Sequence, residues 1–366
     1  MTSGPSQQTG YEHVAAQLSR LCGAVGLADP SAALSLFRDM LGAWGHAALG
    51  AAPAWPSDIT DDATPVELSV AFTDGAPELR FLVEACGSDP SLPSRWEAGR
   101  ALSLLLERRH GIDLGRLRRI EPLFAPAGSS GVFAMWHAAR LHLDRPIDFK
   151  LYLSPQARGR SQARALVEEA LRALGLPGAW RAFSEHALRR RPELDELAFF
   201  SIDLTPRQAA RVKVYTTHHE ATFDELAAVL RAVPDDPAEV QRFHQVITAD
   251  RPYIGRPPVT SLAFVEGRSE PVEATVHLPI RAYVAHDEEA RGRIRAALAP
   301  RAGELAAYDR VMAAFAARRL DAGVGMHTYI SRCRHRGGAR HTLYLSPEAY
   351  RVMPPRASSA SGTSST

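Results

Sequence analysis

Lysine is almost absent from this chain, and the two lysines that it contains stand in the same short pattern. Of the 43 lysine and arginine residues, only Lys150 and Lys213 are lysine, a bias that a GC-rich genome explains most simply. Each is followed two residues later by a tyrosine, Tyr152 and Tyr215. Arginine does not replace lysine where a compact point charge is needed. The two retained lysines are therefore candidates for binding an anionic group, with an aromatic ring beside each.

Further basic and tyrosine side chains, including Arg80, Arg340 and Tyr344, lie in similar alternating segments. Arginine and lysine bind diphosphate through charge-assisted hydrogen bonds, and each tyrosine face stabilises a nearby cation by about 0.5–2 kcal/mol. Together they suit the ionisation of an allylic diphosphate, because the cations stabilise the leaving group and the rings shield the carbocation from water. A protein that only carries a hydrophobic anion would need the same cations and is the alternative.

Strand-like alternation of polar and apolar residues recurs at a nearly constant interval. Alternating segments begin at Val66, Val132, Leu197, Ser261 and Met326, so that successive segments start 66, 65, 64 and 65 residues apart. A second strand pattern follows each one after a short run of turn formers. Such pairs predict five β-hairpins.

Two segments with apolar residues at i, i+3 and i+4 precede each hairpin and predict helices. They span residues 13–26 and 31–45, 96–111 and 113–124, 161–175 and 179–189, 223–233 and 238–248, and 288–299 and 304–319. The repeating unit is therefore α-α-β-β, present five times. Ten antiparallel strands in sequential hairpins close most simply into a barrel without exposed edges. We predict an α+β fold in which helices surround a ten-stranded antiparallel barrel with a cavity inside. Residues 11–355 would form this single domain, with disordered ends at 1–10 and 356–366.

The two faces of the predicted strands differ in polarity, and this decides what the barrel encloses. One face is apolar and suits contact with the helices, so the polar face should point inward, where ten strands leave room for a cavity. An open sheet with a solvated polar face is the alternative. The side chains expected inside are Glu67, Arg80, Lys150, Tyr152, Arg211, Lys213, Tyr215, Arg340 and Tyr344.

The composition excludes several other classes of protein. The chain has 366 residues, of which 45% are hydrophobic and 23% charged, as expected for a folded, well-cored protein. It lacks an apolar run of the length of a spanning helix and a basic, apolar secretion signal at its start, so we expect a cytoplasmic protein. Cys22, Cys86 and Cys333 lie too far apart to suggest a disulfide framework or a thiolate zinc site. The arginines alternate with acids along helices, which argues against nucleic-acid binding.

Known nucleotide and metal motifs are missing or poor. The sequence has no Walker loop and no G-x-G-x-x-G, H-E-x-x-H or G-x-S-x-G pattern. Its nearest approach to an aspartate-rich magnesium motif, D-D-P-A-E at 235–239, contains proline and indicates a helix start capped by Asp235 or Asp236. His218 and His219 have no evident third ligand and suggest a surface turn. We therefore expect chemistry without a metal or other cofactor, in which side-chain cations take the place of Mg²⁺.

The chain resembles the aromatic prenyltransferases of the dimethylallyltryptophan synthase type, most closely the bacterial indole prenyltransferases, from about residue 11 to Pro355. The stretches that carry the resemblance are TPVELSVAF, LRFLVE, MWHAARL, KLYLSP, ARVKVY, TVHLPIRAYVAHD, LDAGVGMHTYIS and TLYLSPEAYRV. It implies a ten-stranded α-β-β-α barrel that moves a dimethylallyl group from dimethylallyl diphosphate to a ring carbon of an indole, with L-tryptophan as the expected acceptor. A larger indole, such as a cyclic dipeptide or an alkaloid, or a phenolic acceptor remains the alternative. We expect a monomer or weak homodimer.

The resemblance also implies roles for individual residues. Glu67 would accept the indole N–H, and we expect it to stay ionised among cations such as Arg80. His277, in a T-V-H segment where fungal members commonly have Q-x-Y, would hydrogen-bond phosphate. His137 would remove the final ring proton or be a satisfied wall residue, with Trp136 packing on the outer face. The diphosphate clamp would be Arg80, Lys150, Arg211 and Lys213, with Arg340 as an added cation where relatives often have tyrosine, and the carbocation shield would be Tyr152, Tyr215 and Tyr344.

Overall fold

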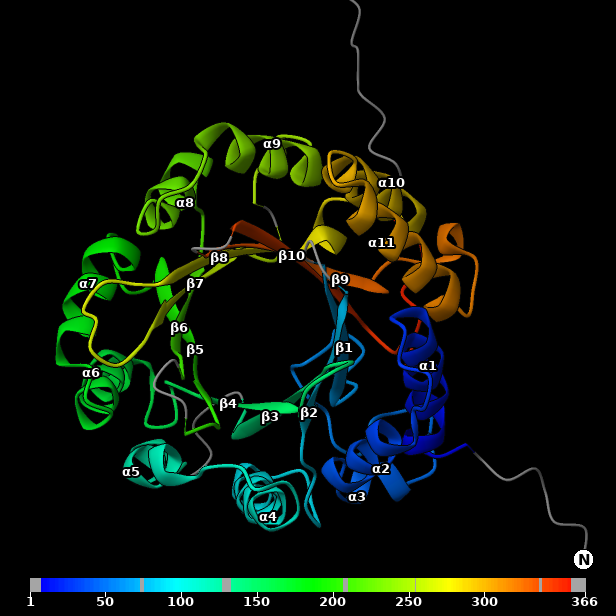
Figure 1. Cartoon of the computed structure of the whole chain (residues 1–366), viewed down its shortest axis with the longest axis horizontal. Helices are drawn as coiled ribbons and strands as arrows, with labels where there is room; N and C mark the ends of the chain where they lie inside the picture. The colour runs from blue at the N-terminus through cyan, green and yellow to red at the C-terminus, as the bar shows by residue number, and fades with distance from the viewer. Residues whose placement is uncertain are drawn as a thin grey trace, which may run out of the picture.

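The chain folds into a closed barrel of ten antiparallel strands inside a ring of helices (Figure 1). The structure, a computed structural model, describes residues 8–72, 76–126, 133–206, 210–253, 255–335 and 338–356. Each strand pairs with its neighbours in sequence, and β10 pairs with β1 to close the barrel. The strands are β1 (Val66–Phe72), β2 (Glu78–Glu84), β3 (Met135–Leu141), β4 (Asp148–Leu153), β5 (Asp195–Asp203), β6 (Val212–His218), β7 (Val259–Phe264), β8 (Glu273–Leu278), β9 (His327–His335) and β10 (Gly338–Leu345).

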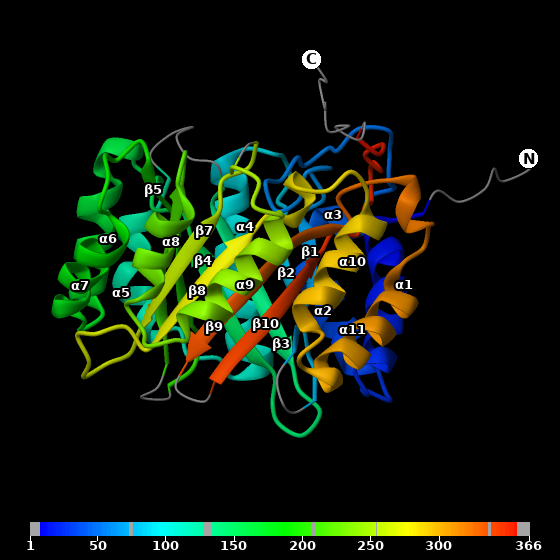
Figure 2. The same ribbon diagram turned by 90° about the horizontal axis from the view of Figure 1, so that it is seen from above.

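A group of helices precedes each of the five hairpins and covers the outside of the barrel (Figures 1 and 2). The helices are α1 (Gly10–Ala24), α2 (Ser31–Met40), α3 (Ala43–His46), α4 (Leu92–His110), α5 (Gly115–Phe124), α6 (Ala163–Ala173), α7 (Pro177–Ala187), α8 (Phe223–Leu230), α9 (Pro237–Thr248), α10 (Asp287–Leu298) and α11 (Ala302–Phe315). The predicted fold, with its five α-α-β-β units, is confirmed.

The hydrophobic core lies between the barrel and the helices. On β1, Val66, Leu68 and Val70 have no exposed surface and belong to one core cluster with residues of the surrounding helices. Phe37 of α2 packs edge-on against Phe81 of β2, with ring centroids 5.3 Å apart. Because successive strand residues point to opposite faces, the polar residues between these positions face into the barrel. Closure of the sheet rules out the open-sheet alternative.

Local signals set the helix ends, with one departure from expectation. Thr222 caps α8, and Asp236 caps α9 as predicted. The helix expected over 31–45 is broken into α2 and α3 at Gly42, whose φ is +62° and where a Cβ atom would lie 2.5 Å from the carbonyl oxygen of Cys86. Only glycine tolerates both conditions readily.

The described chain also extends beyond the predicted domain limits. Thr9 and Glu12 form a capping box at the start of α1, so residues 8–10 belong to the fold instead of a disordered end. The backbone N–H of Arg356 donates to the carbonyl oxygen of Ala285 at 2.9 Å, which ties down the first residue of the expected tail. The remaining predicted disorder, at 1–7 and 357–366, lies outside the described residues. Among the described residues, no helix is long and apolar enough to cross a membrane.

Candidate active site

The inner face of the barrel carries different types of side chain at its two ends. The β-hairpin turns lie at one end, and the connections to the helices lie at the other. Charged side chains gather toward the hairpin end, tyrosines lie in the middle, and Glu67 with further aromatic residues lies toward the connecting end. We call these the charged layer, the tyrosine layer and the acceptor pocket.

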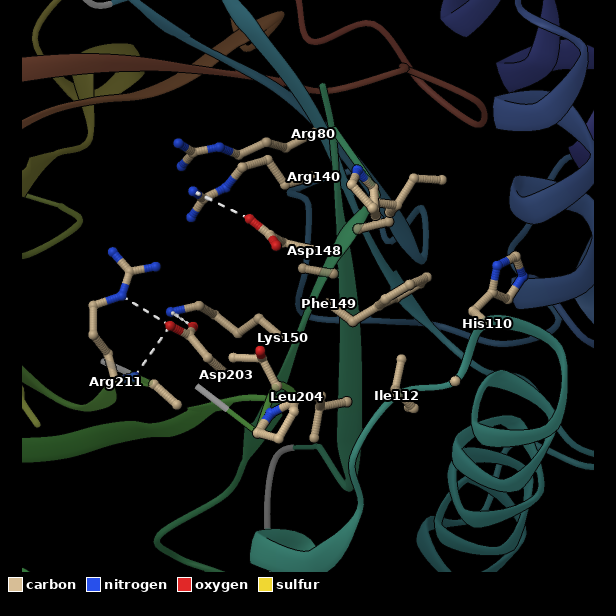
Figure 3. A pocket seen from close by; sticks show the side chains of 18 of the residues that line it. Arg80, His110, Ile112, Arg140, Asp148, Phe149, Lys150, Asp203, Leu204 and Arg211 are labelled. Atoms are coloured by element: carbon tan, nitrogen blue, oxygen red, sulfur yellow. Dashed lines mark hydrogen bonds and ion pairs between the residues drawn. The ribbon is translucent and has the colours of Figure 1, made fainter. Parts of the chain in front are cut away.

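The first half of the charged layer is a chain of alternating cations and carboxylates. Lys150 pairs with Asp203 at 3.1 Å, and Asp203 pairs with Arg211 at 2.8 Å (Figure 3). Arg211 continues to Glu273 at 2.8 Å, which holds Lys213 at 2.6 Å. Each of the two carboxylates therefore holds two cations. Lys150 comes from β4, Lys213 from β6, and Arg211, which both carboxylates hold, directly precedes β6. The sequence prediction that Lys150, Arg211 and Lys213 meet inside the barrel is confirmed, but it did not include the acids between them.

The other half of the charged layer is a second series of this kind, on β2, on β3, in the turn that follows and at the start of β4. Arg80 pairs with Glu78 at 2.7 Å, and Arg140 lies 3.8 Å from both Glu78 and Asp148. Arg145 closes the chain, 3.0 Å from Asp148. Arg80 and Arg140 are direct cross-strand partners, and Figure 3 shows their guanidinium groups extending in the same direction. Two like charges in such a position repel each other, so the pair is suited to an anion between or above them.

Sequence reasoning missed Arg140, although its signal was present. On β3, Trp136, Ala138 and Arg140 share one face, and Met135, His137, Ala139 and Leu141 share the other. The second set is the more apolar and is the one that meets the helices. Burial and the neighbouring charge of Arg80 lower the pKa of Arg140 to about 9.

The charged layer carries more positive than negative charge. Counted over the described residues, it holds seven basic side chains and four carboxylates. The basic side chains are Arg80, Arg140, Arg145, Lys150, Arg211, Lys213 and Arg340. The carboxylates are those of Glu78, Asp148, Asp203 and Glu273. Arg340 acts on Glu78 and Glu273 through its charge. A group with about three negative charges, such as an allylic diphosphate, would neutralise the layer.

The tyrosine layer forms an arc directly beside the cations. The ring of Tyr152 lies 5.9 Å from that of Tyr215, which lies 5.9 Å from His277, which in turn lies 5.7 Å from Tyr344. The Nζ atom of Lys150 lies 6.0 Å from the centre of the Tyr152 ring. Burial raises the pKa of all three tyrosines, so their hydroxyls stay protonated. The structure thus brings together the three expected shield residues and places His277 among them.

The acceptor pocket combines one carboxylate with an aromatic wall. Glu67, only 8% exposed, shares this cavity with Leu82, Tyr329 and two aromatic residues whose rings lie 5.4 Å apart, Trp136 and Phe199. The expectation that Trp136 packs on the outer face is wrong, because the parity of β3 turns it inward. A flat aromatic acceptor can therefore lie against these rings with a hydrogen-bond donor directed at Glu67.

His137 lies on the other side of the barrel wall. It is 1% exposed, and its Nε2 atom lies 2.9 Å from the hydroxyl oxygen of Ser103 on α4. Burial lowers its pKa to about 3. The prediction that His137 takes a ring proton is therefore wrong, since its side chain faces the helices and cannot reach the cavity. It is the wall residue of the alternative interpretation, but only Nε2 is satisfied, since the buried Nδ1 atom has no hydrogen-bond partner among the described residues.

The charge state of Glu67 also differs from expectation. Burial raises its pKa to about 8, against the opposing effects of a hydrogen bond from Thr328, at 3.2 Å, and of the charge of Arg281. The expected influence of Arg80 is absent from these contributions, because Arg80 lies in the charged layer and pairs with Glu78. Glu67 on its own is thus largely protonated at neutral pH.

Charged residues outside the strands surround the acceptor pocket and were not predicted. Arg281, in the 3₁₀ turn Ile280–Ala282, pairs with Asp61 and lies 4.6 Å from the centre of the Tyr329 ring. Asp58 and Arg256 line the same cavity as Glu67, and Arg256 also pairs with Asp61. These residues come from loops, where no periodic pattern reveals which way a side chain points.

The remaining sequence candidates serve the wall. His218 is buried at the end of β6, between Asp195 at 2.8 Å and the hydroxyl of Thr260 at 2.7 Å, so the expected surface turn is wrong for it. His219 follows in the turn and pairs with Glu196 at 3.0 Å. Over the ranges that the structure describes, no three His, Cys, Asp or Glu side chains are grouped as metal ligands would be.

Comparison with known proteins agrees with this geometry. The model of the tryptophan dimethylallyltransferase family matches residues 31–232. A 6-dimethylallyltryptophan synthase from Micromonospora olivasterospora, solved with DMASPP and Trp, is 39% identical over 95% of this chain and 100% of its own, with a TM-score of 0.90. The prenyltransferase PriB, solved with L-tryptophan and dimethylallyl thiolodiphosphate, is 33% identical over 95% and 99%, with a TM-score of 0.86. A 5-dimethylallyltryptophan synthase from Streptomyces coelicolor, solved with DMASPP and Trp, is 31% identical over 96% and 99%, with a TM-score of 0.87.

The barrel and its interior are those of an aromatic prenyltransferase. The chain belongs to the tryptophan dimethylallyltransferase family.

Diphosphate binding should be linked to the protonation of Lys150. Burial and the nearby charges of Arg211 and Lys213 lower the pKa of this lysine to about 7, although Asp203 opposes the shift. Lys150 is thus largely neutral at pH 8, and a bound diphosphate should restore its proton. Calorimetric titration with inorganic diphosphate, in buffers of different ionisation enthalpy, should show nearly one proton more taken up by the wild type than by Lys150→Arg, which stays charged. Equal proton uptake by the two proteins would contradict this assignment.

Proposed function

We propose that this enzyme transfers the dimethylallyl group of dimethylallyl diphosphate to a ring carbon of the indole of L-tryptophan, without a metal ion. The observation that carries the proposal is the order of the three layers: surplus cations, then tyrosine rings, then a carboxylate in an aromatic pocket. This is the order in which the leaving group, the allyl cation and the indole would have to lie. Similar chains were solved with tryptophan and an analogue of this prenyl donor bound.

Ionisation of the donor would take place at the charged layer. As the carbon–oxygen bond breaks, negative charge grows on the diphosphate, and the cations that already face it are held in place by Asp203, Glu273, Glu78 and Asp148. Such preorganised charges stabilise the transition state without having to reorient. The role that Mg²⁺ has in other diphosphate chemistry would here belong to guanidinium and ammonium groups.

The allyl cation would then be held between the tyrosine layer and the indole. Tyr152, Tyr215 and Tyr344 offer ring faces that attract a cation, and their hydroxyls are too weakly acidic to be nucleophilic phenolates at neutral pH. Exclusion of water by these rings favours attack by the indole over hydrolysis. The acceptor carbon forms its new bond on this side of the pocket.

Glu67 would hold the indole N–H and stabilise the positive charge that spreads to the indole nitrogen during attack. Its effect is larger in the transition state than in the ground state, so it should act on kcat. A carboxylate whose pKa lies near 8 in the free enzyme accepts the N–H only when it is ionised. The fraction of enzyme ready to bind the acceptor therefore rises with pH up to about that value.

The amino-acid end of tryptophan would meet the rim of the acceptor pocket. Asp58 and Arg256 line the cavity, and the charge of Arg256 acts on Asp58. These two residues offer one carboxylate for an ammonium group and one guanidinium for a carboxylate. A cyclic dipeptide has neither charged group, and this favours free tryptophan over the larger indoles.

The first test is direct. Incubation of the protein with tryptophan and dimethylallyl diphosphate should give a product heavier than tryptophan by one dimethylallyl group less a proton, as measured by mass spectrometry. Excess EDTA should leave most of the activity intact. Complete loss of activity with EDTA, restored by Mg²⁺, would refute the metal-free clamp, and binding of both compounds without product would favour the carrier alternative.

The second test concerns Glu67. Glu67→Gln keeps the size and one acceptor oxygen but removes the charge, so kcat should fall by about 10²–10³-fold. In the wild type, kcat/KM for tryptophan should rise with pH to a plateau above about 8, and this rise should be lost in Glu67→Gln. Tryptophan methylated on the indole nitrogen should be a similarly poor acceptor. If Glu67→Gln works at a rate close to that of the wild type, the indole assignment fails and a phenolic acceptor becomes the better choice.

The third test concerns the rim. Arg256→Ala should raise KM for tryptophan by about tenfold, the scale of one lost ionic contact, and should leave KM for dimethylallyl diphosphate unchanged. Tryptamine, which lacks the carboxylate, should be a poor substrate for both proteins and insensitive to the substitution. Arg268→Ala, an exposed arginine beyond β7 at the hairpin end, is the matched control and should behave as the wild type. An equal loss with tryptophan and tryptamine would show that Arg256 does not bind the carboxylate.

A further inference from the structure

The last step of the proposed reaction needs a base inside the barrel. After the ring carbon has formed its bond to the prenyl group, that carbon still carries its hydrogen, which must leave as a proton to restore aromaticity. His137 cannot accept it, because its side chain points to Ser103 on the outer face of the wall.

Most basic groups of the cavity already form ion pairs or hydrogen bonds with other residues. Asp203 and Glu273 each hold two cations, which keep their pKa values well below the usual range although burial opposes this. Lys213 pairs with Glu273 and Lys150 with Asp203, and Lys150 should carry its proton once the diphosphate is bound, so neither amine is free to accept another. Glu67 accepts the hydroxyl of Thr328 and, in the proposed function, the indole N–H.

His277 is in a different position. Its Nε2 atom is buried and has no hydrogen-bond partner among the described residues, and the side chain lines the same cavity as Glu67. Its ring stands between those of Tyr215 and Tyr344, at 5.9 Å and 5.7 Å. A buried polar atom without a partner is costly, which indicates that a ligand or a reacting group meets it during the catalytic cycle.

We propose that His277 is the catalytic base that removes the ring proton from the prenylated indole. The proposal rests on the proposed function. The carbon–hydrogen bond of the ring cation breaks, its electron pair returns to the ring, and a nitrogen–hydrogen bond forms at Nε2. The imidazolium ion then passes the proton to the departing diphosphate, which restores the neutral imidazole.

The surroundings of His277 favour this role over phosphate binding. Burial, together with the charge of Lys213, lowers its pKa to about 3, so the imidazole is neutral and has a free lone pair at neutral pH. A weak base is sufficient, because the prenylated ring cation is a far stronger acid than an imidazolium ion. The faces of Tyr215 and Tyr344 stabilise the transient imidazolium as they stabilise the allyl cation.

The test is a kinetic isotope effect on single variants, with tryptophan deuterated at its ring carbons as the probe. In the wild type, loss of the ring proton is fast, and kcat should be equal for deuterated and ordinary tryptophan. His277→Phe keeps an aromatic ring but removes the base, so kcat should fall by about 10²-fold or more and the ratio of the two kcat values should rise clearly above one. Tyr344→Phe, a change in the neighbouring ring, is the matched control: it should slow the reaction without an isotope effect.

A second variant guards against a folding defect. His277→Gln has an amide in place of the imidazole and should show the same isotope effect, and the affinity of both variants for inorganic diphosphate should remain within about threefold of the wild type. A fall in kcat without an isotope effect in both variants, or a kcat equal to that of the wild type, would overturn the proposal. The wild type is assayed first, since absence of prenylated tryptophan would refute the proposed function instead. If it prefers another indole, the same comparison is made with the ring-deuterated form of that acceptor.

Discussion

The hydrogen-bonded pairing of β1 with β10 is the contact on which the whole site depends. It brings the first and last strands into register, with Ser69 opposite Tyr344, and removes both edges of the sheet. Once the barrel is closed, the two-residue period of every strand sends one set of side chains to the helices and the other into a common cavity. Glu67 of the first strand and Tyr344 of the last therefore line the same acceptor pocket, although 277 residues separate them in the sequence.

This constraint explains how much of the site could be predicted from the sequence. Where a strand has one clearly apolar face, as in the segments around Lys150 and Lys213, period-2 alternation places the polar residues inside, and the structure agrees. On β3 both faces are mixed, because Trp136 and Arg140 share one side and His137 lies among apolar residues on the other. The sequence of β3 therefore does not show that His137 faces the helices and Trp136 the cavity.

Other features depend on three-dimensional packing that no periodic pattern contains. Arg281 and Arg256 come from turns and loops, and only the closed barrel brings them to the acceptor pocket. The pKa of Glu67 depends on how completely the barrel removes water from it, and burial outweighs the single nearby guanidinium. The acids Asp203 and Glu273 were visible in the sequence. Their role as holders of two cations each follows from distances between four strands.

The four carboxylates of the charged layer resolve a conflict between folding and catalysis. The buried and half-buried cations of this layer would repel one another and destabilise the barrel, because burial removes the water that screens their repulsion. Carboxylates placed between them reduce this repulsion and fix the direction of each cation, but they do not remove the surplus positive charge. In the proposed function, a bound diphosphate would balance that surplus. The leaving group gains negative charge as its bond to carbon breaks, so the same surplus would interact more strongly with the transition state than with the bound donor. Part of the attraction between the barrel and the diphosphate would therefore form only as the reaction takes place.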